Sequence, residues 1–298
     1  MLYSYDLLTT VRKYDKIIIV WLYKKSEKSE RLFFEGSEGR EGAMKETVYR
    51  VNIPRLRGLG KSLCFALVSD LHNEDPSEAI AALERRRPDY ILMPGDIFEL
   101  LDGTMQEKSE GGFALMSACA SIAPTFYSIG NHENGGTGSW VPGWDKKTGK
   151  HRAISAENAE RIKESGAILL DDSFVLRDGI AFAGLTSGLS NDAHEPRTDW
   201  LRELCAVDGP KILLCHHPEY YTDYGIKDMP IDLIVSGHAH GGQWRFFGRG
   251  VYAPGQGLFP KYTSGVHDGK FVISTGLKKS RRIPRLFNEP ELVFIENA

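Results

Sequence analysis

Five apolar runs of the sequence are each followed directly by side chains that can bind a metal ion. These side chains lie in the stretches SDLH, GDIFE, GNHE, CHHP and GHAH. They are Asp70, His72, Asp96, Asn131, His132, His216, His217, His238 and His240. A mixture of imidazole nitrogens and carboxylate oxygens suits Mn, Fe, Zn or Co, whereas an all-oxygen set suits Mg or Ca. No cysteine is in the set, so the pattern predicts a transition-metal site without thiolates.

The spacing within DLH and HAH favours shared metal sites. In each stretch one residue separates the two potential ligands. Side chains alternate along an extended segment with a period of two, so both members of a pair can leave the chain on the same side. Neighbouring glycines allow tight turns and a close approach of the backbone. Each motif alone also occurs in ordinary turns, but five of them after apolar runs indicate metal binding.

The apolar runs are predicted to be buried strands of a parallel sheet. Between residues 63 and 133 the runs LCFALVSD, DYILMPGD and TFYSIGNHE alternate with the helical patterns SEAIAALERR and GGFALMSACASI. Alternating strands and helices imply a parallel sheet with helical crossovers. Ligands bind beyond the carboxyl ends of the strands in such sheets. The potential metal ligands are therefore expected to converge at one edge.

The second half of the chain repeats this pattern with more strands. Helices are predicted over SAENAERIKESG and RTDWLRELC, and strands over AILL, SFVLR, IAFAGL, KILLCHHP, IDLIVSGHAH, KFVIST and ELVFIE. Two mixed sheets packed together with helices outside accommodate this number of elements. The pattern alone also leaves a single large sheet open.

The composition is that of an ordinary globular protein. The chain has 298 residues, 41% of them apolar, and a net charge of −3, so it can bury a large core. It has no long basic block of the kind that lines a nucleic-acid groove. The four cysteines are scattered and form no CxxC pair, which favours a reducing compartment and hence a cytoplasmic location.

Residues 1–46 are predicted to be an N-terminal extension and linker that precedes a catalytic domain over residues 47–298. The apolar run IIIVWLY at 17–23 is far shorter than the roughly 20 residues that span a bilayer. A strand or a short surface helix is expected there. Lysines flank the run, which leaves peripheral membrane contact open. Charged and glycine-rich stretches follow it, as in a solvated linker.

The series DLH, GD, GNHE, a histidine pair before proline and GHAH resembles the calcineurin-like metallophosphoesterase family over roughly residues 65–296. The GGQ after GHAH, with YAPGQGLFPKYTSG and PRLFNEPELVFI, is similar to a bacterial branch. That branch includes membrane-associated phosphohydrolases that act on lipid-linked or UDP-sugar pyrophosphates. The resemblance implies a four-layer α/β/β/α sandwich of two mixed sheets flanked by helices.

The resemblance also implies a role for each position. One divalent ion would be held by four side chains: Asp70, His72, Asp96 and His240. A second would share Asp96 and be completed by three more: Asn131, His216 and His238. His132 matches the family histidine that faces the phosphate. Only the first histidine of the HHP pair matches a family ligand, so His217 would support a ligand or contact the substrate.

The implied activity is hydrolysis of phosphoester or pyrophosphate bonds. Two ions about 3.5 to 4 Å apart would clamp a phosphoryl group, acidify a bridging water to hydroxide and stabilise an in-line displacement. Asp96, as the shared ligand, and His132 are the predicted catalytic residues. His132 would protonate the leaving oxygen or stabilise charge on the phosphoryl group. Glu133 or another carboxylate would orient His132, unless Glu133 is a solvated loop residue.

Two further segments are candidates for substrate contacts. Residues 134–151 are rich in glycine and carry Trp140 and Trp144, which either face a base, sugar or acyl chain or pack the loop down. In the run KKSRRIPR, Arg281 or Arg282 would bind distal phosphates, unless the run is a solvated face. This run departs from the bacterial branch. The substrate class stays broad: a phosphorylated small molecule, a sugar nucleotide or a lipid-linked compound.

Two other functions are less consistent with the sequence. A nuclease on the same fold is disfavoured because the chain has no basic stripe. A non-catalytic scaffold would be expected to have lost ligand positions, whereas all seven are present here. The sequence therefore predicts a metallophosphoesterase with two divalent ions, manganese among the candidates.

Overall fold

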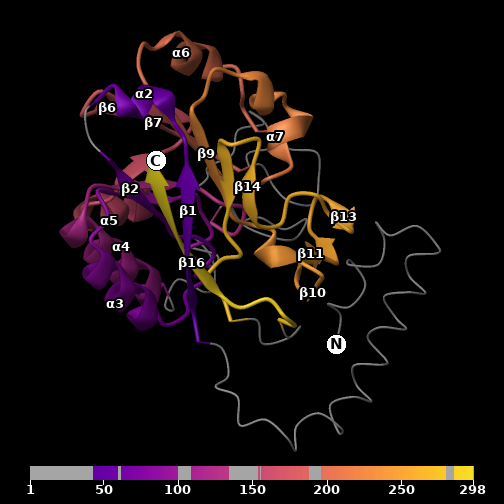
Figure 1. The fold of residues 1–298 in the computed structure, drawn as a ribbon. Helices are drawn as coiled ribbons and strands as arrows, with labels where there is room; N and C mark the ends of the chain where they lie inside the picture. Colours follow the sequence, from indigo (N-terminus) through magenta and orange to yellow (C-terminus); the bar gives the residue numbers. More distant parts are fainter. Residues whose placement is uncertain are drawn as a thin grey trace, which may run out of the picture. The chain divides into compact units, whose positions relative to one another are not determined.

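Two six-stranded mixed sheets form the core of the protein (Figure 1). The computed structural model describes residues 43–59, 62–99, 109–133, 154, 156–187, 196–279 and 285–297. The first sheet has the strand order β1 (Lys45–Val51), β16 (Glu291–Asn297), β2 (Cys64–Leu67), β3 (Tyr90–Met93), β4 (Thr125–Ser128), β5 (Ile168–Leu170). The second has the order β14 (Gly265–His267), β15 (Phe271–Ile273), β9 (Leu233–Ser236), β8 (Lys211–Cys215), β7 (Ile180–Leu185), β6 (Ser173–Arg177).

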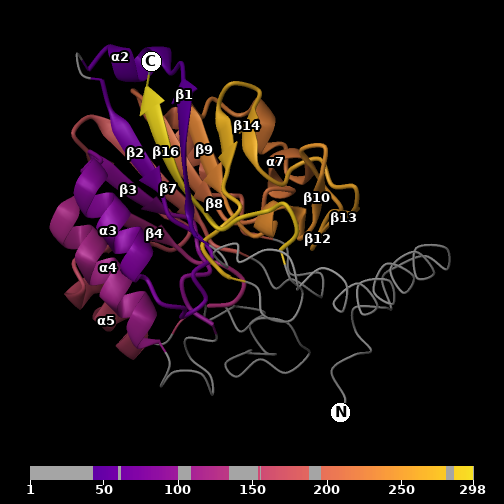
Figure 2. The same ribbon diagram turned by 60° about the horizontal axis from the view of Figure 1, so that its bottom comes forward.

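Helices cover the outer faces of both sheets. The helices of the described residues are α2 (Pro54–Arg57), α3 (Ser77–Arg86), α4 (Glu110–Ile122), α5 (Ala156–Glu164), α6 (Leu201–Ala206) and α7 (Tyr220–Asp223). Helices α3, α4 and α5 lie along the first sheet (Figure 2), and their buried faces share one apolar cluster with it. Residues of α6 and α7 share another cluster with the second sheet.

The two sheets pack directly against each other through a third apolar cluster. At its centre the rings of Phe126 on β4 and Phe182 on β7 stack with their centroids 3.8 Å apart. Both side chains are fully buried. Helices, sheet, sheet and helices thus form the predicted four-layer sandwich, and the alternative of a single large sheet is excluded.

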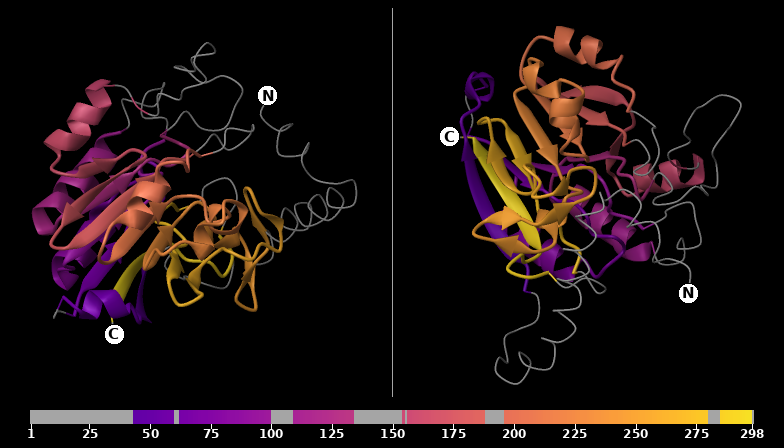
Figure 3. Two further views of the ribbon diagram at one scale, coloured as in Figure 1. Left: turned by 90° about the horizontal axis from the view of Figure 1, so that it is seen from above. Right: turned by 90° about the vertical axis from the view of Figure 1, so that its right-hand side faces the viewer.

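Strand β1 is an element that the sequence patterns did not predict. It pairs in parallel with the C-terminal strand β16, from Lys45 beside Glu291 to Val51 beside Asn297; Figure 3 shows the two strands side by side. It begins before Thr47, the predicted start of the domain. The half-exposed, charged stretch KETVYRV lacks the continuous apolar run of a central strand, because β1 lies at a sheet edge. The division of the chain at residue 46 stays a prediction.

Several predicted features lie outside the described residues, among them the apolar run at 17–23. None of the helices in the described part of the chain is long and apolar enough to cross a bilayer.

Candidate metal centre

The carboxyl ends of strands from both sheets bring six of the seven predicted ligands together. Strands β2, β3 and β4 are parallel neighbours in the first sheet, and β8 and β9 are parallel neighbours in the second. Each ligand lies within five residues of its strand's end. Among the described residues, four groups of three have potential ligand atoms within 4.8 Å of one another. Two of these groups consist of predicted ligands alone: Asp70, His72 and His240, and Asp96, His216 and His238.

Asp96 lies between the two groups. Its Oδ2 atom is 3.0 Å from Nε2 of His216 in one group and 3.7 Å from Nε2 of His72 in the other. The second carboxylate oxygen, Oδ1, accepts a hydrogen bond of 2.9 Å from the backbone N–H of His132. The side chain is therefore fixed through one oxygen and directs the other between the two groups, as a bridging ligand would.

Asp70 anchors the first group. Its Oδ1 atom is 3.7 Å from Nε2 of His240 and 4.0 Å from Nε2 of His72. The hydroxyl of Ser69 donates to Oδ2, and the backbone N–H of His238 donates to Oδ1 at 3.0 Å. This last bond ties the carboxylate of the first group to the loop that carries a ligand of the second.

Buried polar atoms without hydrogen-bond partners mark both groups. Within the described part of the chain, five ligand atoms are of this kind: His72 Nε2, Asp96 Oδ2, Asn131 Oδ1, His216 Nε2 and His238 Nε2. His216 Nε2 and Asp96 Oδ2 are close but are not aligned as a hydrogen bond. An unsatisfied buried polar group costs about 1 to 3 kcal/mol, so five together would cost about as much as the net stability of a domain. These residues fit divalent cations, which would satisfy all five atoms.

The backbone at the ligands is strained. Five of the seven have positive φ angles, between 44° and 63°: Asp70, His72, Asp96, His238 and His240. Residues other than glycine rarely adopt this region, and such residues cluster at functional sites. If the strands continued straight, these side chains would not point toward a common centre. The turns instead direct them into a common centre.

Glycines allow this crowding at two places. A Cβ atom on Gly237, just before His238, would collide with Ser69 and with the carboxylate of Asp70. A Cβ atom on Gly130, just before Asn131, would collide with Asp96. The glycines that flank the ligand motifs are thus required by close packing of one loop on another.

Most of the imidazoles are held neutral, as metal ligands must be. Burial lowers the pKa of His72, and neighbouring His132 lowers it further. Burial also lowers the pKa values of His238 and His240 well below the ordinary value, with adjacent imidazoles adding to the effect. His216 differs, since burial is outweighed by Asp96 and its pKa is raised to about 9. A cation bound there would take the place of that proton.

Glu99 is a site residue that the sequence interpretation did not identify. Its two carboxylate oxygens each lie 2.8 Å from an imidazole Nδ1 atom, one of His72 and one of His132. Burial would raise the pKa of Glu99, but these two hydrogen bonds hold it far below its ordinary value. An ionised Glu99 accepts hydrogen bonds from the Nδ1–H groups of both imidazoles, which directs each Nε2 atom toward the centre.

The sequence left open whether Glu133 or another carboxylate orients His132, and the carboxylate in contact with His132 is Glu99. Glu133 is buried, and its carboxylate accepts hydrogen bonds from the backbone N–H groups of Asp96, Phe98 and Gly130 at 2.8 to 3.0 Å. Burial and nearby Asp96 raise its pKa to about 7. Glu133 is therefore neither a solvated loop residue nor the partner of His132. It joins the loop of Asp96 to the loop of Asn131.

Replacing Glu99 by glutamine is expected to lower kcat/KM about 10- to 100-fold, the usual effect of losing a hydrogen-bond partner of a ligand histidine. The amide cannot accept from both imidazoles, so His72 and His132 lose their fixed orientation. Steady-state kinetics on a soluble phosphodiester would measure the loss. Glu84→Gln, an exposed change on α3, is the matched control. Unchanged kinetics in Glu99→Gln protein would show that this carboxylate does not position the two imidazoles.

The C-terminal segment supports the His240 loop. Asn288 donates to the backbone oxygens of His240 at 2.7 Å and Gln243 at 3.0 Å. The guanidinium of Arg285 donates to the backbone oxygen of Thr275 and lies 3.3 Å from Nδ1 of His240. Arg285 is the last residue of the predicted phosphate-binding run KKSRRIPR, so one end of this run does reach the centre.

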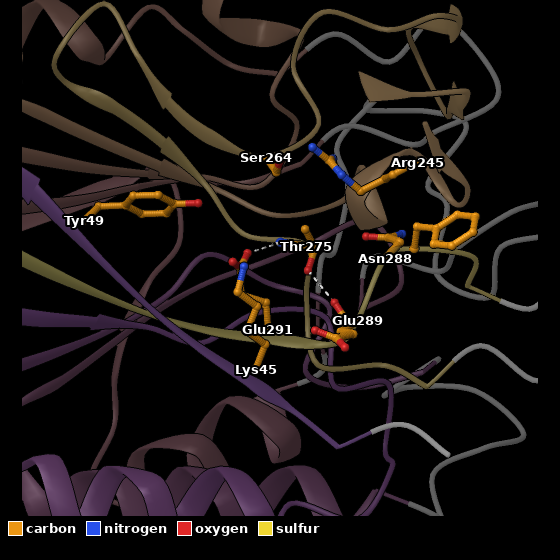
Figure 4. Close-up of a pocket in the computed structure, with 9 residues that line it drawn as sticks. Lys45, Tyr49, Arg245, Ser264, Thr275, Asn288, Glu289 and Glu291 are labelled. Atoms are coloured by element: carbon orange, nitrogen blue, oxygen red, sulfur yellow. Dashed lines mark hydrogen bonds between the residues drawn. The ribbon is translucent and has the colours of Figure 1, made fainter. Parts of the chain in front are cut away.

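A cavity of about 360 Å³ adjoins the same loop. It is lined by Lys45, Tyr49, Arg245, Ser264, Thr275, Phe287, Asn288, Glu289 and Glu291. Figure 4 shows Tyr49 on one side and Arg245 and Asn288 on the other. Arg245 donates to the backbone oxygen of Gly241 at 2.9 Å. Its described lining includes none of the predicted metal ligands, so the cavity is separate from the metal centre.

The predicted substrate contacts are only partly described. Trp140, Trp144, Arg281 and Arg282 lie outside the described residues. His217 is buried behind the centre, where its Nδ1 atom is 3.0 Å from Glu219 and its ring centroid is 4.0 Å from that of His238. This position suits the support of a ligand better than direct contact with a substrate. Its role stays a prediction.

Comparison with known proteins matches the chain to one protein family. A sequence profile of the calcineurin-like phosphoesterase family matches residues 64–242, which is more than half of the chain and includes all seven predicted ligands. A metallophosphoesterase of Campylobacter jejuni is 26% identical over 199 residues, 65% of this chain and 47% of that protein. The phosphodiesterase YaeI of Escherichia coli is 27% identical over 173 residues, 57% of this chain and 55% of that protein.

The chain spans about half the length of these two relatives. A metallophosphoesterase of Aquifex aeolicus is matched over more of its length, with 25% identity over 269 residues, 84% of this chain and 89% of that protein.

Proposed function

Because the chain belongs to the calcineurin-like phosphoesterase family, we propose that it hydrolyses phosphoesters with the help of two divalent cations. The observation that carries the proposal is the set of five unpaired buried ligand atoms arranged around Asp96. One cation would be held by Asp70, His72, Asp96 and His240. The other would be held by Asp96, Asn131, His216 and His238.

The cations would polarise the phosphoryl group and lower the pKa of a bound water, so that attack on phosphorus is possible near neutral pH. The protein's contribution is to fix the ligands before the substrate arrives. The bonds from Ser69 to Oδ2 of Asp70 and from His132 to Oδ1 of Asp96 do this without using the oxygens nearest the imidazoles, and the backbone N–H of His238 adds a bond to Oδ1 of Asp70. Such preorganisation avoids a cost of rearrangement during the reaction.

His132 is the proposed acid for the leaving group. Its side chain is 18% exposed, whereas that of His72 is 1% exposed, so a substrate can reach it. Glu99 holds its Nδ1 atom, and its Nε2 atom lies 3.9 Å from Asp96 Oδ2. A proton on Nε2 would therefore pass to the oxygen that leaves phosphorus. Lys278, 3.2 Å from Glu99, adds positive charge beside this position.

The substrate is proposed to be a phosphodiester or pyrophosphate of a small molecule, sugar nucleotide or lipid-linked compound. The name phosphodiesterase, printed for the Escherichia coli relative, supports a diester. The GGQ sequence after GHAH supports placement in the bacterial branch with this motif. The four cysteines are free, which supports action in a reducing compartment such as the cytoplasm.

Metal-loaded protein is expected to hydrolyse bis-p-nitrophenyl phosphate, and a chelator is expected to abolish the activity. Removal of the cations leaves the buried ligand atoms unpaired and the phosphoryl group without charge stabilisation. Release of p-nitrophenolate measures the rate, with Mn²⁺, Zn²⁺, Co²⁺ and Mg²⁺ each added back to the chelated protein. Full activity in the continued presence of chelator would exclude the proposed function.

A further inference from the structure

Four phenylalanine side chains are exposed on the surface near the metal centre. Phe246 is 47% exposed, Phe247 106%, Phe259 74% and Phe287 81%; we refer to these four as the phenylalanine patch. Single exposed apolar residues are common and need no explanation. Several large aromatic side chains on one structural unit are different, because such patches mark sites of interaction.

Backbone hydrogen bonds join the segments of the patch into one unit. Arg245 N–H donates to Leu286, Val251 N–H to Trp244, and Phe259 N–H to Val251, all at 2.8 to 2.9 Å. The rings of Phe246 and Phe287 lie edge to face, with centroids 6.0 Å apart. The short strands β10 (Arg245–Phe246), β11 (Arg249–Gly250), β12 (Tyr252–Ala253) and β13 (Gly257–Leu258) lie together beside the second sheet in Figures 1 and 2.

Three of the four phenylalanines occupy turns that disfavour them. Phe247, Phe259 and Phe287 have φ angles of 51° to 54°, a region that glycine and asparagine adopt more readily than bulky residues. Phe247 and Gly248 form the two-residue turn between β10 and β11, and both have positive φ. Asn-Gly is the preferred sequence for such a turn. Phe247 does not stabilise this turn, which indicates that its side chain serves an interaction with another molecule.

The segment that carries Phe246, Phe247 and Phe259 contains cations but no acidic residue, whereas Glu289 lies two residues from Phe287. Between Asp232 and Asp268 the sequence contains no acidic residue, but it contains Arg245, Arg249 and Lys261. Arg249 and Lys261 are exposed. The chain as a whole has a net charge of −3, so this segment is more positively charged than the chain on average. Cations beside exposed aromatic side chains complement an anionic surface with an apolar interior.

We propose that the phenylalanine patch inserts into the interface of an anionic lipid bilayer. Aromatic side chains on the tips of turns can enter the headgroup region while Arg249 and Lys261 contact the phosphates of the lipids. The patch begins six residues after His240 in the sequence. Asn288, the neighbour of Phe287, donates to the backbone oxygen of His240 at 2.7 Å, so insertion would bring the metal centre close to the lipid surface. The inference concerns binding alone and does not depend on the proposed hydrolysis.

Vesicle binding by the full-length protein tests the proposal. The variant Phe247→Asn/Phe259→Asn/Phe287→Asn removes the three exposed rings but keeps residues that accept positive φ. Its partition onto vesicles of phosphatidylcholine and phosphatidylglycerol is expected to fall at least about tenfold. Its melting temperature is expected to stay the same or rise, because asparagine suits these turns better. Its hydrolysis of bis-p-nitrophenyl phosphate in solution should match that of the wild type.

Two control variants separate the contributions. Leu176→Asn removes an apolar side chain that is 65% exposed on β6, outside the patch, and should bind vesicles like the wild type. Arg249→Gln/Lys261→Gln should weaken binding to vesicles that contain phosphatidylglycerol and leave weak binding to pure phosphatidylcholine unchanged.

Three results would overturn the proposal. In the first, the wild type binds neither kind of vesicle. In the second, the triple asparagine variant binds as well as the wild type, which would assign binding to another segment such as the apolar run at 17–23. In the third, sedimentation shows that the wild type dimerises and that the triple variant is monomeric, while both bind vesicles equally. The patch would then be a contact between two copies of the chain.

Discussion

The variant Asp96→Asn is expected to lose activity by about a thousandfold or more in kcat/KM. Its Oδ2 atom is buried and unpaired and lies between His216 and His72. The amide has a similar shape and can still accept from the backbone N–H of His132 through its oxygen. It lacks the negative charge that would hold two cations, and losing several kcal/mol of transition-state stabilisation corresponds to this factor.

The matched control for this change is Asp208→Asn, which neutralises an exposed aspartate and should leave kcat/KM unchanged. Kinetics on bis-p-nitrophenyl phosphate and far-UV circular dichroism together separate loss of function from loss of fold. A folded Asp96→Asn protein with wild-type kinetics would show that the space between the two groups is not where the reaction occurs.

The variant His132→Ala is expected to lower kcat about 10²- to 10⁴-fold, the range usual for removing a positioned acid, while the bound metal is retained. The imidazole is held by Glu99 and is not required for either group of ligands. The loss should be largest for a substrate with a poor leaving group, such as an alkyl phosphate. It should be smaller for p-nitrophenolate, which leaves without protonation.

The control for this variant is His267→Ala, since His267 lies on β14 and bonds to the backbone of Ser264. An equal loss for good and poor leaving groups would contradict proton donation by His132. Such a result would instead favour stabilisation of charge on the phosphoryl oxygens.

Much of the fold, and the convergence of the candidate metal ligands, could be predicted because local sequence signals agreed with the tertiary structure. The apolar runs before Asp70, Asp96, Asn131, His216 and His238 are central strands, whose burial on both faces produces continuous apolar sequence. Parallel neighbours must end at the same edge, so the residues that follow them converge regardless of their separation in the chain. This reasoning needs no knowledge of the turns themselves.

Other residues could not be predicted because their contacts depend on several loops at once. Glu99 follows Asp96 by three residues and resembles an ordinary loop acid, but it bonds to His72 and His132 from two other loops. The sequence predicts Glu133 to be either solvated or a partner of His132, but its buried carboxylate accepts hydrogen bonds from three backbone N–H groups. No pattern in the local sequence predicts contacts between residues of different loops.

Contacts from the C-terminal segment were missed for the same reason. Asn288 supports the backbone of His240 from 48 residues away in the sequence. The edge strand β1 is held in the sheet by its pairing with β16, which lies at the opposite end of the chain. Half-exposed edge strands carry weak periodic signals, because only one face is packed against the core.

The stoichiometry of bound metal tests the central claim most directly. Chelated wild-type protein, reloaded with Mn²⁺ or Co²⁺ and freed of excess ion, is expected to contain about two ions per chain by elemental analysis. Asp96→Asn protein treated in the same way should hold fewer. A wild-type protein that binds no ion, with its ligands intact and its fold unchanged, would contradict the account.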